Sequence, residues 1–146
     1  MVLDTNVVLD LLHFEDAIAY PIRAALQHGQ IRCVANEATL EELRRVLAYP
    51  EFKLESVRQA TLFTQYQRLV RMLDTQPVSV ELPICSDPDD QKFLELAASS
   101  HADLLVSKDR ALLKLRRRCA PRFQIMAPAE AVRWLATFNL GPVAET

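Results

Sequence analysis

Short apolar runs alternate with helical patterns along this chain, and that alternation is its strongest constraint on the fold. The pattern predicts strands at residues 31–35, 78–82, 104–107 and 123–126, after a short apolar start at residues 1–3. It predicts helices at residues 5–12, 18–28, 36–48, 54–73, 88–99, 110–117 and 129–138. Strands that alternate with helices favour an α/β fold, in which a parallel sheet is covered by helices on both faces.

The composition limits both the domain number and the possible functions. With 146 residues, of which 50% are hydrophobic and 25% charged, the chain suits one globular domain over residues 1–146. Its two glycines, Gly29 and Gly141, exclude the GxGxxG, Walker A and GxSxG loops. No apolar run approaches the roughly 18 residues of a membrane helix, and the chain does not begin with a signal peptide. We therefore expect a cytoplasmic protein with no membrane association.

The cysteines and histidines do not form the pattern of a zinc site. Cys33, Cys85 and Cys119 are widely spaced and include no CxxC pair, so we expect buried thiols of a reducing compartment. The histidines form no HExxH motif or other paired ligand spacing. Both observations argue against a zinc enzyme.

Acidic residues occur where such a fold would bring them together. Asp4 and Asp109 each follow a predicted strand, and parallel sheets bind ligands outside the carboxyl ends of their strands. Asp90 falls within the apolar stripe of its helix, where a buried carboxylate needs a partner. Glu42 borders the buried face of another helix, whereas its neighbour Glu41 points to solvent. These positions predict an acidic cluster at one edge of the sheet.

Each acid also has a simpler explanation on its own. Asp4, Asp87 and Asp109 can cap helices, and Glu42 can belong to a solvated charged face. Crowded carboxylates, however, raise one another's pKa unless a cation neutralises them. Because hard oxygen ligands suit Mg²⁺ or Mn²⁺, the acids considered together predict a divalent metal site.

Positive charge is concentrated in the last third of the chain, although the formal net charge of the whole chain is −2. Between residues 108 and 122 the chain has one acid, Asp109, and these cations: Lys108, Arg110, Lys114, Arg116, Arg117, Arg118 and Arg122. A solvated helix face explains such a cluster, and so does a patch that binds the phosphate backbone of a nucleic acid. The sequence leaves both interpretations open.

Three blocks of the chain resemble, in the same order, PIN-domain ribonucleases of the VapC-like toxin type: LDTNVVLDLL, LEELRRVLAYPEF and SDPDDQKFLELAASSHADLLVSKDRALL. The resemblance implies a three-layer α/β/α sandwich that hydrolyses RNA phosphodiester bonds with one or two Mg²⁺ or Mn²⁺ ions. It also implies a toxin that is paired with an antitoxin protein, and it makes a homodimer plausible.

The resemblance also implies roles for particular residues. Its catalytic acids correspond to Asp4, Glu42, Asp90 and Asp109. Of these, Asp4, Asp90 and Asp109 would bind the metal directly, and Glu42 would bind it or position the attacking water. The supporting polar positions correspond to Asn6, Asp87 and Ser107. The nucleic-acid contacts would come from Lys108, Arg110, Lys114, Arg116, Arg117 and Arg118.

Three other interpretations compete with a ribonuclease. A phosphatase of the haloacid-dehalogenase type also begins with an aspartate after its first strand, but it needs a second acid where Asn6 stands. A phosphoryl-receiver domain needs paired acids at its first strand and a phosphorylatable aspartate on a middle strand, which the sequence lacks. A catalytically silent binding module would use the same acids only as helix caps and surface charge.

Overall fold

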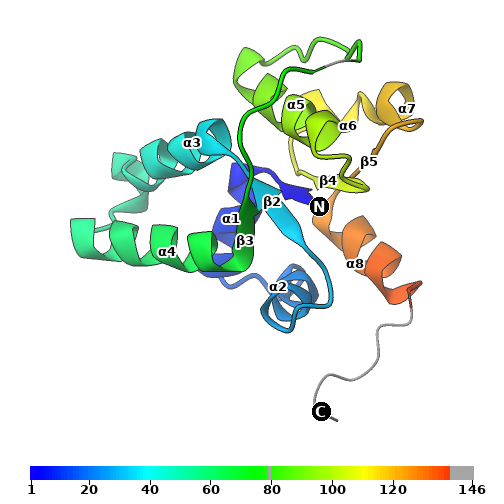
Figure 1. Cartoon of the computed structure of the whole chain (residues 1–146). Coiled ribbons are helices and arrows are strands. Elements are labelled where there is room, and N and C mark those ends of the chain that lie inside the picture. The colour runs from blue at the N-terminus through cyan, green and yellow to red at the C-terminus, as the bar shows by residue number, and fades with distance from the viewer. Residues whose placement is uncertain (79, 139–146) are drawn as a thin grey trace.

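The computed structural model of the chain describes residues 1–78 and 80–138 (Figure 1). Its strands are β1 (Val2–Leu3), β2 (Cys33–Ala35), β3 (Val70–Met72), β4 (Leu104–Val106) and β5 (Gln124–Met126). Its α-helices are α1 (Thr5–Leu12), α2 (Tyr20–Gln27), α3 (Glu37–Leu47), α4 (Ser56–Leu69), α5 (Gln91–Ser99), α6 (Arg110–Leu113), α7 (Arg116–Cys119) and α8 (Pro128–Ala136). Two 3₁₀ turns, η1 (Pro50–Phe52) and η2 (Pro88–Asp90), precede α4 and α5.

All the strand pairs are parallel. Strand β4 lies between β1 and β5, and β2 pairs with β3. The two groups of strands meet where the backbone N–H of Val34 donates to the carbonyl oxygen of Met1 at 3.0 Å. This bond places β2 beside β1, so the carboxyl ends of the strands face one edge, as the predicted α/β fold requires.

The sheet separates two apolar cores, because successive strand residues point to opposite faces. Leu3, Leu104 and Val106 belong to the core that is covered by α1, α2, α3, α4 and α8. Val2 and Leu105 belong to the core that is covered by α5, α6 and α7. Figure 1 shows these two groups of helices on either side of the strands. The resulting α/β/α sandwich confirms the expected fold class.

The helix that carries Glu42 has a well-defined start. Asn36 Oδ1 accepts a hydrogen bond from the backbone N–H of Thr39 at 3.0 Å, and Thr39 Oγ1 accepts one from the N–H of Asn36 at 3.1 Å. This capping box satisfies two backbone donors at the first turn of α3. It fixes where α3 leaves the carboxyl end of β2, and therefore where Glu42 lies along the helix axis.

The third strand is not where the sequence predicts it. The helix predicted at residues 54–73 ends at Leu69, and β3 (Val70–Met72) follows it. Residues 78 and 80–82, predicted as strand, form no strand, and residue 79 lies outside the described residues. Hydrogen bonding to the edge of β2 overrides the helical pattern of residues 70–73.

Other differences are smaller. Helix α2 begins at Tyr20 rather than at residue 18. The helix predicted at residues 88–99 opens as the 3₁₀ turn η2, and the one predicted at residues 110–117 is divided into α6 and α7. Element boundaries depend on capping and on the last hydrogen bonds, which a periodic pattern does not specify.

Two expectations from the composition can be compared with the structure. Cys33, Cys85 and Cys119 are all buried free thiols, as predicted. Among the helices of residues 1–78 and 80–138, none combines the length and the apolar character needed to cross a membrane.

The capping box gives a testable expectation for stability. Asn36→Ala removes a buried side-chain acceptor at the N-terminus of α3, so it should lower the free energy of unfolding by about 1–2 kcal/mol. Glu55→Ala is the matched control, because Glu55 precedes α4 without capping it through its side chain. Urea denaturation of the two variants measures the difference. Equal losses would show that the box does not stabilise α3.

Candidate metal centre

Three aspartates from separate elements meet at the carboxyl edge of the sheet. Asp4 directly follows β1, Asp109 lies in the turn after β4, and Asp90 ends η2 immediately before α5. One carboxylate oxygen from each lies within 4.8 Å of the other two. We call Asp4, Asp90 and Asp109 the acidic triad. The structure thus brings together three of the four acids that the sequence singles out.

Asp4 is held in place by the strand and by a serine. Its backbone N–H donates to the carbonyl oxygen of Val106 at 3.0 Å, which extends the pairing of β1 with β4. Ser107 Oγ, fully buried, donates to Asp4 Oδ2 at 2.7 Å. Asp4 stands at the N-cap position of α1, as predicted, but its side chain makes no capping hydrogen bond, so capping does not account for its carboxylate.

Ser107 also positions Asp109. The backbone N–H of Asp109 donates to Ser107 Oγ at 2.9 Å, so one hydroxyl joins two members of the acidic triad. Asp109 Oδ1 in turn accepts from the backbone N–H of Ala111 at 2.9 Å and caps α6. Asp109 is therefore both a helix cap and a member of the acidic triad.

Asp90 is buried, and one of its carboxylate oxygens lacks a hydrogen-bond partner within the part of the chain that the structure describes. The residue is 7% exposed, and its Oδ2 has no hydrogen-bond partner within residues 1–78 and 80–138. Burial raises the pKa of Asp90 to about 8, and contact with Asp109 and the charge of Asp4 contribute to this rise. Burial likewise raises the pKa of Asp4 to about 6, against the lowering effect of the Ser107 hydrogen bond.

The acidic triad fits a hard divalent cation. Buried carboxylates that repel one another are stabilised by a positive charge between them. The unpartnered Oδ2 of Asp90 needs such a neighbour, and carboxylate oxygens are the ligands that Mg²⁺ and Mn²⁺ prefer. The acidic triad can therefore bind a metal ion.

Glu42 lies beside the acidic triad but is bound to other side chains. Its Oε1 accepts a hydrogen bond from Lys92 Nζ at 2.9 Å, and its Oε2 accepts a short one from Thr5 Oγ1. Thr5 follows Asp4 directly, so this contact places Glu42 beside the site, and the charge of Glu42 helps to raise the pKa of Asp4. Glu41 is 55% exposed and pairs with Arg44 at 3.6 Å. The predicted rotation of α3, with Glu42 inward and Glu41 outward, is thus observed.

Sequence reasoning missed Lys92. The signal that would have pointed to it is its position two residues after Asp90, on a helix expected to border the acidic edge.

The two expected supporting residues besides Ser107 are exposed. Asp87 caps η2 by accepting from the backbone N–H of Asp89 at 3.0 Å, and Asn6 lies in the first turn of α1.

Two of the six cations predicted to contact nucleic acid form ion pairs with acidic side chains of the protein. Lys108 Nζ lies 2.7 Å from Asp10 Oδ2. Arg116 donates two hydrogen bonds to Glu130, at 3.0 and 3.1 Å, and so links α7 to α8. The other four are exposed: Arg110, Lys114, Arg117 and Arg118. Lys108 is exposed as well, although it is paired with Asp10, whereas Arg116 is half-buried.

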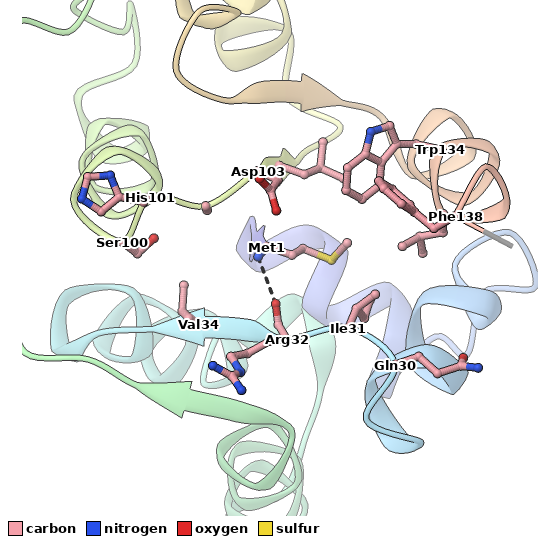
Figure 2. Close-up of a pocket in the computed structure, with 13 residues that line it drawn as sticks. Met1, Gln30, Ile31, Arg32, Val34, Ser100, His101, Asp103, Trp134 and Phe138 are labelled. Atoms are coloured by element: carbon pink, nitrogen blue, oxygen red, sulfur yellow. Dashed lines mark hydrogen bonds between the residues drawn. The ribbon is translucent and has the colours of Figure 1, made fainter. Parts of the chain in front are cut away.

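A pocket of about 520 Å³ lies at the opposite edge of the sheet (Figure 2). Its lining includes Met1, Arg32, Asp103, Trp134 and Phe138, and thus the residues just before β1, β2 and β4. Figure 2 shows the Met1 amine donating to the carbonyl oxygen of Arg32, a bond of 3.0 Å. Because the acidic triad lies at the carboxyl ends of the strands, this pocket is separate from it.

Comparison with protein families identifies the family of the chain. The sequence model of the family described as "PIN domain" matches residues 1–111, which include β1 to β4 and the whole acidic triad. The chain therefore belongs to the PIN-domain family, whose members are typically metal-dependent nucleases. No curated protein and no solved structure matches the chain.

The raised pKa values predict how stability depends on pH without metal. Asp4 and Asp90 bind protons more tightly in the folded than in the unfolded chain, so the folded state holds more protons between about pH 4 and pH 8. The free energy of unfolding in EDTA should therefore fall as pH rises through this range. Asp90→Asn should reduce the fall and stabilise the metal-free protein at pH 8 by about 1 kcal/mol or more.

Asp89→Asn is the matched control, because Asp89 is the exposed neighbour of Asp90. Thermal or urea unfolding at several pH values, with EDTA and with millimolar Mn²⁺, measures both effects. Mn²⁺ should stabilise the wild type and the Asp89→Asn variant more than the Asp90→Asn variant. If both variants have the wild-type pH profile, the pKa of Asp90 is not raised in the folded state.

Proposed function

We propose that this protein is a metal-dependent endoribonuclease. The observation that carries the proposal is the convergence of three carboxylates from β1, η2 and the turn after β4, with a buried oxygen of Asp90 left unpartnered. A binding module that used its acids only as caps would not need such a cluster, since an isolated cluster of buried carboxylates costs folding free energy. Membership of the PIN-domain family supports the same function.

In this proposal the acidic triad holds Mg²⁺ or Mn²⁺. The bound ion supplies polarisation of the scissile phosphate and activation of water for in-line displacement. Ser107 fixes the Asp4 carboxylate relative to the backbone of Asp109, because its hydroxyl donates to Asp4 Oδ2 and accepts from the Asp109 N–H. The N–H of Ala111 holds the Asp109 carboxylate itself. Such fixed geometry lowers the reorganisation that the reaction requires.

The choice of RNA as substrate is supported by the exposed cations that follow Asp109 in the chain. Arg110 follows Asp109 directly, Lys114 is the residue after α6, and α7 carries the exposed side chains of Arg117 and Arg118. Exposed cations beside a hydrolytic site attract a polyanion and orient its backbone. We propose that single-stranded RNA runs along these helices into the site.

We also propose that the protein is the toxin of a toxin–antitoxin pair and that it binds an antitoxin protein, with a homodimer as its own assembly. The support is the resemblance of the three blocks at residues 3–12, 40–52 and 86–113 to toxins of this type. Induced synthesis of the wild-type chain in bacteria should then arrest growth, and an inactive variant should not.

Activity should require both the metal and the acidic triad. Asp4→Asn and Asp109→Asn each remove one ligand charge, and we expect each to lower the rate of RNA cleavage by at least about a hundredfold. Asparagine can still cap α6, so the Asp109 variant should stay folded. Cleavage of a labelled single-stranded RNA, with Mg²⁺ or Mn²⁺ and with excess EDTA, measures the effect.

Asp89→Asn serves as the control for loss of a nearby carboxylate that lies outside the acidic triad. Full activity in EDTA, or in the Asp4→Asn variant, would contradict the proposed function. No RNA cleavage by wild-type protein that demonstrably binds Mn²⁺ would favour a silent module or another phosphoryl substrate.

The exposed cations should determine RNA affinity. Replacing Arg117 and Arg118 by Ala should weaken binding of all RNA sequences alike, and the slope of log affinity against log salt should become shallower by about 0.7 for each phosphate that is no longer bound. Ala at both Arg58 and Arg68, exposed on α4, is the matched control. Affinity is measured at several salt concentrations in the Asp4→Asn background. An unchanged salt slope would assign Arg117 and Arg118 to a solvated helix face.

A further inference from the structure

Both oxygens of Glu42 are already bound within the chain. Lys92 Nζ donates to Oε1 at 2.9 Å, and Thr5 Oγ1 donates to Oε2. The side chains of Glu42 and Lys92 are only 12% and 19% exposed. Separating such a pair would leave two charges partly buried without compensation, which is strongly unfavourable. Glu42 is therefore held firmly by Lys92 and Thr5.

The residues that hold Glu42 also adjoin the acidic triad in the chain. Thr5 follows Asp4 directly, and Lys92 lies two residues after Asp90. Glu42 thus connects the start of α1 to the first turn of α5 through a side chain of α3. This connection holds together two segments whose aspartates repel each other.

The charges have a further effect on what the site can bind. Lys92 compensates the charge of Glu42, which leaves the acidic triad and the exposed carboxylate of Asp87, whose charge also raises the pKa of Asp90, as the local negative charge. One divalent ion neutralises most of the charge of the triad. Asp87 is exposed and caps η2, so Glu42 is the largely buried carboxylate beside the triad that could complete a second site. Coordination of a second ion by Glu42 would require breaking the pair with Lys92.

We propose that Glu42 is a positioning residue rather than a metal ligand, and that Lys92 thereby limits the site to one divalent ion. This inference rests on the proposed function only in that the acidic triad is the place where the ion binds. It assigns to Lys92 a role in setting the number of ions: its ammonium group occupies the carboxylate oxygen that a second ion would need.

The test is a titration of the full chain with Mn²⁺ alone, followed by calorimetry and by the electron paramagnetic resonance signal of free Mn²⁺. The wild type should bind one ion. Lys92→Gln leaves Glu42 unpaired beside the site, so the first ion should bind about tenfold more tightly, and a second ion should bind. The double variant Glu42→Gln with Lys92→Gln removes both charges and should bind one ion with an affinity close to that of the wild type.

Two wild-type ions, or a double variant with much weaker binding than the wild type, would show that Glu42 is a ligand and would overturn the proposal. Lys53→Gln is the control for loss of an exposed lysine and should bind as the wild type does. If Lys92→Gln does not fold, the wild-type stoichiometry and the double variant still decide the question. Because no RNA is present, absence of ribonuclease activity does not affect the result.

Discussion

The parallel pairing of β1 with β4 is the constraint on which the rest of the site depends. Val2 lies opposite Leu105 and Leu3 opposite Val106, so the next residues along the two strands are Asp4 and Ser107. A shift of one residue in this register would turn one of these two side chains to the opposite face of the sheet from the other. The register is well defined because the alternate residues of both strands are buried in different cores. The cores therefore determine the geometry of the acidic triad.

Without metal, the carboxylates of the acidic triad lower the free energy of unfolding of the protein. Asp4 and Asp90 are buried with raised pKa values, so each is more easily ionised in the unfolded chain. Three local interactions offset part of this cost: the Ser107 hydroxyl, the Asp109 cap of α6, and the pair of Glu42 with Lys92. Each also fixes a carboxylate or the segment that carries one. The same contacts thus stabilise the metal-free protein and organise the site.

Some of this arrangement can be predicted from the sequence and some cannot. The proximity of Asp4 to Asp109 follows from two strand ends, and the inward position of Asp90 and Glu42 follows from helical periodicity. The pair of Glu42 with Lys92 could not be predicted, because it depends on how closely α3 approaches α5. The position of β3 is unpredictable for a similar reason, since its pairing with β2 decides the conformation of residues 70–72. The engagement of Arg116 by Glu130 also depends on a tertiary contact, between α7 and α8.

The cap formed by Asp109 links the chemistry of the site to the surface around it. One oxygen of this carboxylate holds the first turn of α6, a helix of four residues that leads into α7. An ion bound to the Asp109 carboxylate would therefore affect the hydrogen bond that begins α6, the helix that starts at Arg110 and is followed by Lys114. Under the proposed function, occupancy of the metal site and attachment of RNA to these helices would be linked equilibria. By thermodynamic reciprocity, each would change the affinity for the other by the same factor.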